Sequence, residues 1–249
     1  MAVPDRAPPA ALLVEAALFL DFDGTLVELA ESPAAISVPS GLKPLLGRLA
    51  ERLGGRVAIV SGRSITDIEA HLDCSAVAVS GSHGLELRLR NGAELPLATP
   101  AGLDEARLAV DAFAETADGL LVEHKPLGVA LHFRRAPDEA ERSSAFMEEL
   151  AARSGLKIQK GKMVVELRPG GADKGDAVRA FMAEPEFVGA RPVFVGDDVT
   201  DEHAFEAVAA MGGAGILVGP PRPSAARYRL DDVAAVAAWL QEAAAGLPR

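Results

Sequence analysis

The fold is decided by the stretch Ala17-Leu18-Phe19-Leu20-Asp21-Phe22-Asp23-Gly24-Thr25-Leu26, an apolar run that ends in two carboxylates and a Gly-Thr turn. Side chains at positions i and i+2 of an extended strand point to the same side. Asp21 and Asp23 can therefore converge at a strand end, where like charges need a cation or a shared proton to coexist. That arrangement suits a nucleophile, an acid/base and a divalent metal. A plain Asp-Gly-Thr turn is the alternative that this stretch alone leaves open.

Short apolar runs alternate with amphipathic stretches along much of the chain. Four of the runs predict strands buried on both faces: residues 18–22, 56–60, 76–80 and 192–195. Helices are predicted over the stretches with helical apolar spacing: residues 41–53, 64–72, 174–182, 201–210 and 231–244. The alternation predicts an α/β fold with a doubly wound, Rossmann-like parallel sheet. Such sheets bind ligands at the C-terminal ends of their strands.

Residues 84–172 have a different pattern and predict an inserted α+β domain within a core domain of residues 1–83 and 173–249. Apolar and polar residues alternate in three stretches, as in an antiparallel sheet with one covered face: Glu86–Arg90, Gly128–Arg134 and Lys162–Arg168. Helical patterns lie between them, over 103–117 and 138–153. We expect residues 1–16 to form a loose lead-in and residues 243–249 a frayed tail.

Composition restricts the class of partner. The net charge of −11 argues against nonspecific nucleic-acid binding, which needs clustered Lys and Arg. No apolar run is long enough to span a bilayer, and the N-terminus lacks the basic region of a signal peptide. The single Cys74 fits a reducing cytoplasm. Residues 84–172 hold 12 Lys and Arg against 14 Asp and Glu, whereas the remainder holds 13 against 22, so an anionic ligand is more easily held in or beside this segment.

Three further motifs follow predicted strands or begin predicted helices. Ser61, in Val60-Ser61-Gly62-Arg63, precedes a helix whose backbone amides could bind phosphate, although a plain cap remains open. Lys174 begins a helix, where an exposed surface lysine is the alternative. Asp197, Asp198 and Asp201 follow a strand closely, and capping accounts for one acid more readily than for three. Acidic groups at two strand ends predict a site for a hard cation such as Mg²⁺.

These motifs, in this order, resemble those of the haloacid dehalogenase-like phosphatases. Other segments resemble the trehalose 6-phosphate phosphatase family within that superfamily, from about residue 17 to about residue 240: Val60–Arg63, Ser82–Glu86, His124–Pro126, Gly161–Pro169 and Gly196–Glu202. The resemblance implies Mg²⁺-dependent hydrolysis of trehalose 6-phosphate to trehalose and phosphate through an aspartyl-phosphate. It also implies a small-molecule sugar phosphate as partner, without nucleic acid or membrane, and a separate trehalose-phosphate synthase, because the chain is too short to contain both activities.

By this resemblance, Asp21 is the nucleophile and Asp23 the acid/base. The metal is held by the carboxylates of Asp21 and Asp197 and by the backbone carbonyl of Asp23. Asp198 or Asp201 would orient Lys174 or metal-bound water.

The resemblance also assigns residues to the phosphoryl group and to the sugar. Ser61, Gly62, Arg63 and Lys174 would hold the phosphoryl oxygens, although Arg63 fits a solvated helix start equally well. The inserted domain would act as a cap that supplies the sugar contacts: Glu86, Lys125, Lys162, Glu166 and Arg168. Cross-strand pairing on a solvated sheet face remains the alternative for Glu166 and Arg168.

Alternative functions remain open. A capped phosphatase for sucrose 6-phosphate or mannosyl phosphoglycerate would share the core aspartates and differ in the cap. A noncatalytic sugar-phosphate sensor would need no nucleophile beside an acid, so the pair Asp21 and Asp23 argues against it.

Overall fold

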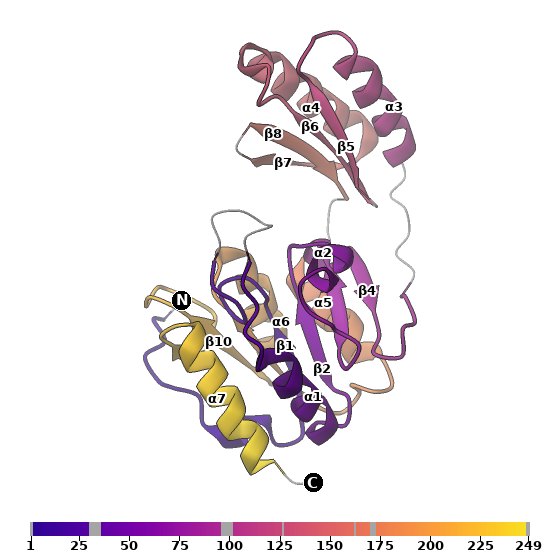
Figure 1. The fold of residues 1–249 in the computed structure, drawn as a ribbon. Helices are drawn as coiled ribbons and strands as arrows, with labels where there is room; N and C mark the ends of the chain where they lie inside the picture. The colour runs from indigo at the N-terminus through magenta and orange to yellow at the C-terminus, as the bar shows by residue number, and fades with distance from the viewer. Residues whose placement is uncertain are drawn as a thin grey trace. The chain divides into compact units, whose positions relative to one another are not determined.

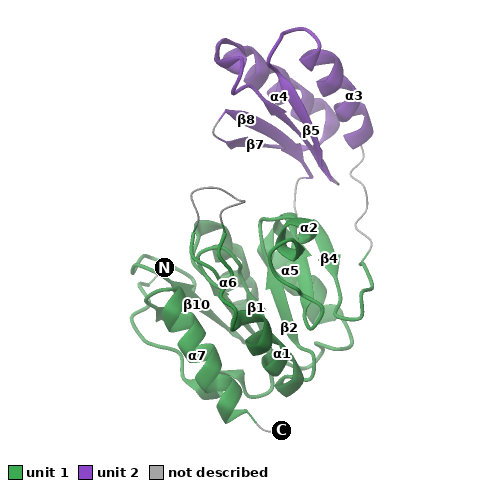
Figure 2. Cartoon of the chain, in the orientation of Figure 1, with its two compact units in different colours: residues 1–96, 172–249 green, residues 97–171 purple. Residues whose placement is uncertain are grey.

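A computed structural model describes residues 2–29, 36–95, 102–125, 127–161, 163–169 and 173–247. The chain forms two compact units (Figure 2), which we call the core unit, residues 1–96 and 172–249, and the inserted unit, residues 97–171. Each unit has its own sheet and its own apolar core. Among the described residues, no helix combines the length and hydropathy needed to cross a membrane.

The core unit is built on a seven-stranded sheet in the order β11-β10-β9-β1-β2-β3-β4 (Figure 1). Its strands are β1 (Ala16–Leu20), β2 (Val57–Val60), β3 (Ala78–Gly81), β4 (Glu86–Arg88), β9 (Arg191–Gly196), β10 (Ala214–Val218) and β11 (Tyr228–Leu230). All neighbours are parallel except β3 and β4. In the register of the sheet, Leu20 of β1 lies opposite Ile59 of β2 and Val195 of β9. The C-terminal ends of β1, β2 and β9 therefore lie side by side.

Helices cover both faces of the core sheet, which confirms the predicted doubly wound α/β arrangement. The apolar cluster on one face includes Leu18 and Leu20 together with side chains of α1 (Leu42–Arg52), α2 (Ile65–Glu69) and α7 (Val233–Gly246). Phe19 points to the other face, because side chains alternate along a strand. Its ring stacks on that of Phe181 in α5 (Lys174–Ala183), and α6 (Glu202–Ala210) packs against α5.

The inserted unit has a four-stranded antiparallel sheet in the order β5-β6-β8-β7. Its elements are α3 (Leu103–Ala114), β5 (Leu121–Lys125), β6 (Gly128–His132), α4 (Ala140–Ser154), β7 (Lys157–Gly161) and β8 (Val164–Arg168). Both helices pack on the sheet through a shared apolar cluster that includes Val129, Leu131, Val165 and Leu167. The alternating pattern of β8 thus predicts its buried face correctly.

The core unit extends further along the chain than the sequence indicates. We expected Glu86–Arg90 in the inserted domain, but β4 pairs with β3 of the core sheet, with Glu86 opposite Gly81. The turn of residues 82–84 between them is short enough for an antiparallel hairpin, so this strand cannot join the other sheet.

Both chain ends are also better packed than expected. Residues Ala10–Leu13 form a 3₁₀ helix with Leu13 buried in the core, and the carbonyl of Arg6 accepts a hydrogen bond from Arg229 N of β11. At the other end, α7 continues to Gly246 and Leu247 is buried. The predictions of a loose lead-in and a frayed tail are therefore wrong for the described residues.

Candidate active site

Three predicted site residues lie at one edge of the core sheet. Asp21 follows β1, Ser61 follows β2 and Asp197 follows β9, and these strands are direct neighbours. The carbonyl of Val195 accepts a hydrogen bond from Asp21 N at 2.9 Å, which extends the pairing of β1 and β9 to Asp21. The strand order therefore brings the three residues together, as the sequence predicts.

Lys174 completes a buried charged group with Asp21 and Asp201. Its Nζ lies 2.8 Å from Asp21 Oδ1 and 2.6 Å from Asp201 Oδ1. Lys174 is the first residue of α5, and a capping box between Asp173 and Asp176 fixes that helix start. The alternative of an exposed surface lysine is thus excluded, because Lys174 is only 3% exposed.

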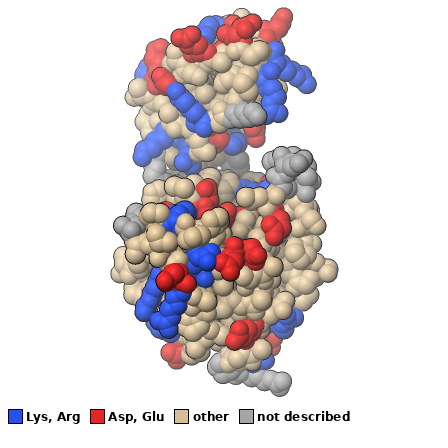
Figure 3. Space-filling view, turned by 90° about the vertical axis from the view of Figure 1, so that its left-hand side faces the viewer, with Lys and Arg blue, Asp and Glu red and all other residues tan. Residues whose placement is uncertain are grey.

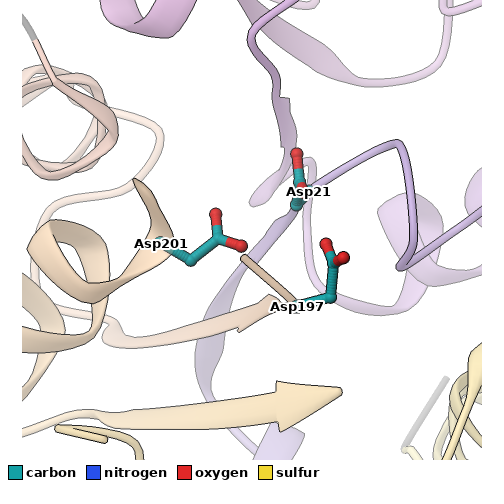
Figure 4. Close-up of side chains that lie close together, drawn as sticks. All are labelled: Asp21, Asp197 and Asp201. Carbon is teal, nitrogen blue, oxygen red and sulfur yellow. The ribbon is translucent and has the colours of Figure 1, made fainter. Parts of the chain in front are cut away.

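Asp197 joins this group from the end of β9. The side chains of Asp21, Asp197 and Asp201 converge in Figure 4, and one carboxylate oxygen of each lies within 4.8 Å of the others. Burial raises the pKa of Asp21 and of Asp201, although Lys174 counteracts this effect. Burial and the charge of Asp201 raise the pKa of Asp197. Burial opposes the charge of Lys174, but attraction by Asp21 and Asp201 outweighs it, so the pKa of Lys174 is raised.

The donor set of this cluster fits a metal ion. Three carboxylates lie close together and only two of them pair with Lys174, and oxygen ligands of this kind suit a hard divalent cation. Among the described residues, the Asp197 carboxylate has no ion-pair partner; it accepts a long hydrogen bond, 3.5 Å, from Thr25 Oγ1 and shares a hydrogen bond with the Asp21 side chain. A buried cluster of aspartates that could hold a metal is therefore present.

Gly24 is required where the loop after β1 approaches Asp197. Its φ is +74°, a backbone conformation that L side chains rarely adopt, and a Cβ there would lie 2.2 Å from Asp197 Oδ2. The Asp-Gly-Thr turn is therefore present, and it allows the side chain of Asp197 to approach the loop after β1.

Asp23 does not point into this cluster but pairs with Arg63. Arg63 Nε donates to Asp23 Oδ2 at 2.6 Å and Nη2 donates to Oδ1 at 2.9 Å, a two-point contact that fixes the carboxylate. Nη1 of the same guanidinium donates to Asp67 Oδ2. Arg63 is thus engaged by two carboxylates, which the sequence did not indicate.

The loop after β2 carries the predicted phosphate-binding residues Ser61 and Gly62. Ser61 is buried and its Oγ accepts a hydrogen bond from Arg63 N at 3.1 Å, whereas Gly62 is exposed. The turn of residues 82–84, which follows β3, holds this loop in place, because Ser82 N donates to Arg63 O and His83 N donates to Ser61 O. Ser82 and His83 both have positive φ, a strained conformation that no pattern in the sequence signals. Ser64 caps α2, because its side chain accepts a hydrogen bond from Asp67 N.

The two acids that follow Asp197 have different surroundings. Asp201 is fully buried, and its Oδ2 accepts a hydrogen bond from Asp198 N while its Oδ1 holds Lys174. The side chain of Asp198 is exposed and caps the short helix Val199–Asp201. Of the two candidates for orienting Lys174, only Asp201 contacts it.

The predicted sugar-binding residues are divided between the units. In the inserted unit, Lys125 Nζ donates to Glu166 Oε2 at 2.5 Å, and Arg168 lies opposite Lys157 at the end of β8. Lys162 lies outside the described residues. Glu86 belongs to the core unit, where its carboxylate accepts hydrogen bonds from Ser82 Oγ and from Ile65 N of α2. A sugar contact by Glu86 would require it to release these partners.

Comparison with known proteins decides the family. The profile of the Trehalose-phosphatase family matches residues 19–234. The chain belongs to the trehalose-phosphatase family. It is 44% identical over 212 residues to a "Probable trehalose-phosphate phosphatase" of Sinorhizobium fredii (strain NBRC 101917 / NGR234), covering 84% of this chain and 79% of the relative. It is 34% identical over 233 residues to "Trehalose-6-phosphate phosphatase" of Escherichia coli (strain K12), covering 90% and 85%.

A solved structure shares the fold. The C-terminal domain of C. albicans trehalose-6-phosphate phosphatase superposes with a TM-score of 0.71 at 22% identity, over 98% of this chain and 99% of that domain. Family membership and fold together confirm the resemblance drawn from the motifs. They also confirm the predicted enzyme class for this member of the trehalose-phosphatase family, a phosphoric monoester hydrolase.

Proposed function

We propose that this chain hydrolyses trehalose 6-phosphate to trehalose and phosphate. The observation that carries the proposal is the buried group of Asp21, Lys174 and Asp201 beside Asp197, in a chain of the trehalose-phosphatase family. An ion pair with Lys174 fixes the Asp21 carboxylate at the edge of the sheet where parallel-sheet proteins bind ligands. A protein that only bound the sugar phosphate would not need this arrangement.

The reaction proceeds in two displacements at phosphorus. A carboxylate oxygen of Asp21 bonds to phosphorus while the bond to the sugar oxygen breaks, and Asp23 gives a proton to that oxygen. Water then attacks the aspartyl-phosphate, Asp23 takes a proton from the water, and the bond between phosphorus and Asp21 breaks to release phosphate. Lys174, Ser61 Oγ and the exposed backbone of Gly62 bind the phosphoryl oxygens.

Arg63 positions the acid/base in this scheme. Its two contacts to Asp23 fix the direction of the Asp23 carboxylate. We therefore propose that Arg63 holds Asp23 in position. The predicted contact of Arg63 with phosphate would require a change in the present hydrogen bonds of Arg63.

Mg²⁺ is the proposed cofactor, held by the carboxylates of Asp21 and Asp197 and by the backbone carbonyl of Asp23. When bound, it supplies a charge that offsets the negative charge on the transferring phosphoryl group. Support comes from the crowding of three carboxylates, two of them buried, beside a single ammonium group. The protein holds these oxygens in place through the ion pair of Lys174 with Asp21 and through the close approach of Gly24 to Asp197.

The inserted unit is the proposed cap that selects the sugar. Lys125 and Glu166 already form an ion pair, and each of these groups can exchange its partner for sugar hydroxyls. Arg168 and Lys162 are proposed to act with them. Alternative substrates with the same core chemistry are sucrose 6-phosphate and mannosyl phosphoglycerate, and they differ in the contacts they would make with this unit. We also propose that a separate synthase supplies the substrate, and that the enzyme acts in the cytoplasm, in line with the single buried Cys74.

Phosphate release from a panel of sugar phosphates tests the proposal. The panel contains trehalose 6-phosphate, sucrose 6-phosphate, mannosyl phosphoglycerate and glucose 6-phosphate, with Asp21→Asn as the matched variant of nearly equal shape. We expect kcat/KM for trehalose 6-phosphate to exceed that for glucose 6-phosphate by at least about 100-fold, because a site built for hydroxyl groups rejects substrates that lack them. Equal values would refute the substrate assignment. Tight binding of trehalose 6-phosphate without turnover would instead indicate a sensor.

A further inference from the structure

The loop between β10 and β11 contacts the backbone of the proposed metal site through Arg222. Arg222 Nη2 donates to the carbonyl oxygen of Asp198 at 2.9 Å and, in a longer contact of 3.4 Å, to that of Asp197. Its Nη1 donates to Glu202 Oε1. We infer that Arg222 is a positioning residue for Asp197, with Glu202 as the group that holds Arg222 in place. This inference rests on the metal site of the proposed function.

Glu202 fixes the loop that carries Arg222. It is the first residue of α6, directly after Asp201, and its side chain is largely buried. Besides Arg222, its carboxylate accepts hydrogen bonds from Ser224 Oγ at 2.9 Å and from Ala225 N at 2.8 Å. Charge-assisted hydrogen bonds to a planar guanidinium fix both distance and direction. The loop and the start of α6 are thus tied to each other next to the acidic cluster.

Arg222 acts on the peptide unit between Asp197 and Asp198. The N–H of that unit belongs to Asp198 and donates to Asp201 Oδ2 at 2.9 Å. The C=O of the same unit belongs to Asp197 and accepts from Arg222. The peptide is therefore held on both sides, by a carboxylate at its N–H and by a guanidinium at its carbonyl.

Orientation of this peptide determines where the Asp197 carboxylate points. Among the described residues, no ion pair fixes that carboxylate; its partners are Thr25 Oγ1, in a long contact of 3.5 Å, and the Asp21 carboxylate, which is itself a proposed metal ligand. Its direction is set by the backbone that carries it. Groups that orient a metal ligand without touching the metal typically account for about 10–100-fold in metal affinity. Loss of Arg222 should therefore weaken metal binding.

Mn²⁺ binding to the full chain tests the inference without reference to turnover. Substrate is absent, and the concentration of free Mn²⁺ is measured by electron paramagnetic resonance. The variants are Arg222→Gln and Arg222→Lys. The matched control is Arg229→Gln, because Arg229 also donates to a backbone carbonyl of this loop, that of Gly219 at 2.7 Å, and pairs with Asp231. We expect Arg222→Gln to raise the Kd for Mn²⁺ by at least about tenfold. Arg222→Lys should lie between it and the parent, and Arg229→Gln should match the parent.

Two results would overturn the inference: an unchanged Kd in Arg222→Gln, or an equal rise in Arg229→Gln, which would trace the effect to general loosening of the loop. Fluorescence of Trp239, the only tryptophan, reports whether each variant is folded. If Arg222→Gln does not fold, Arg222→Lys decides alone, with a weaker Kd supporting the inference and a parental Kd refuting it. A parent protein that binds no Mn²⁺ would refute the proposed metal site itself, a separate outcome.

Discussion

Replacing Lys174 by methionine removes the ammonium group between the carboxylates of Asp21 and Asp201. Lys174 is 3% exposed, and its Nζ lies 2.8 Å from one carboxylate and 2.6 Å from the other. With an effective dielectric constant of about 20, each contact is worth roughly 6 kcal/mol before desolvation of the ions is subtracted. Removing one partner of a buried pair costs about 3–5 kcal/mol, because the other charge stays buried. We expect the free energy of unfolding of the core unit to fall by about this amount.

Urea unfolding followed by tryptophan fluorescence measures this change in the relevant unit, because the only tryptophan, Trp239, is buried in α7 of the core unit. Arg179→Met is the matched control on the same helix. Arg179 is half exposed and pairs with Asp176, so its loss should cost less than about 1 kcal/mol.

A second substitution separates charge from packing. Asp201→Asn in the Lys174→Met background removes one of the two carboxylates left without a partner, so it should restore part of the lost stability. Activity should not return, because the group that holds Asp21 is still missing. The reasoning is refuted if Lys174→Met unfolds at the same urea concentration as Arg179→Met, or if the double variant is less stable than Lys174→Met alone.

Four other outcomes are expected. Excess chelator should stop phosphate release and added Mg²⁺ should restore it; full activity in chelator would remove the metal from the mechanism. Asp21→Asn should abolish phosphate release, because it removes the proposed nucleophile; undiminished turnover would exclude the covalent route. Gly24→Ala should abolish Mn²⁺ binding, because its Cβ would lie 2.2 Å from Asp197 Oδ2. Gly92→Ala is the control and should keep Mn²⁺ binding: its φ is also positive, +84°, but no described atom lies within 4 Å of its Cβ, so it should cost only about 1–2 kcal/mol of backbone strain. Equal metal binding in both variants would contradict this reasoning. Glu166→Gln should raise KM for trehalose 6-phosphate more than it lowers kcat, and an unchanged KM would argue against a sugar contact.

The sequence predicts the central strands but not the edges of the core sheet. The strands β1 and β2 are continuous apolar runs, and β3 and β9 each contain an apolar run, which indicates burial on both faces. By contrast, β11 is three residues long with Arg229 at its centre, and it is a strand because it pairs with β10 and with the segment around Arg6. The alternating pattern of β4 fits either sheet, so only the tertiary fold decides which one it joins.

The sequence predicts the site residues that follow strands, because strand order brings them together. It does not predict the partners of side chains on loops. Asp21, Asp197 and Lys174 meet because strand order brings their elements together. The hydrogen bonds of Arg63 to Asp23, of Glu86 to the start of α2 and of Arg222 to the Asp197 carbonyl join residues that no periodicity relates. Their partners depend on loop geometry, and each side chain has an equally reasonable role as a solvated surface group.

The fixed cations of the site are distributed so that the Asp197 carboxylate forms no ion pair among the described residues. Lys174 pairs with Asp21 and Asp201, and Arg63 pairs with Asp23. Arg222 donates a hydrogen bond to the backbone carbonyl of Asp197. On the face drawn in Figure 3, basic and acidic side chains are interspersed, so this face offers no broad basic surface to attract an anion. A phosphate dianion approaching the cluster would meet net negative charge there unless a divalent cation had already bound at Asp197. We therefore expect the metal to be needed for substrate binding as well as for the chemical step.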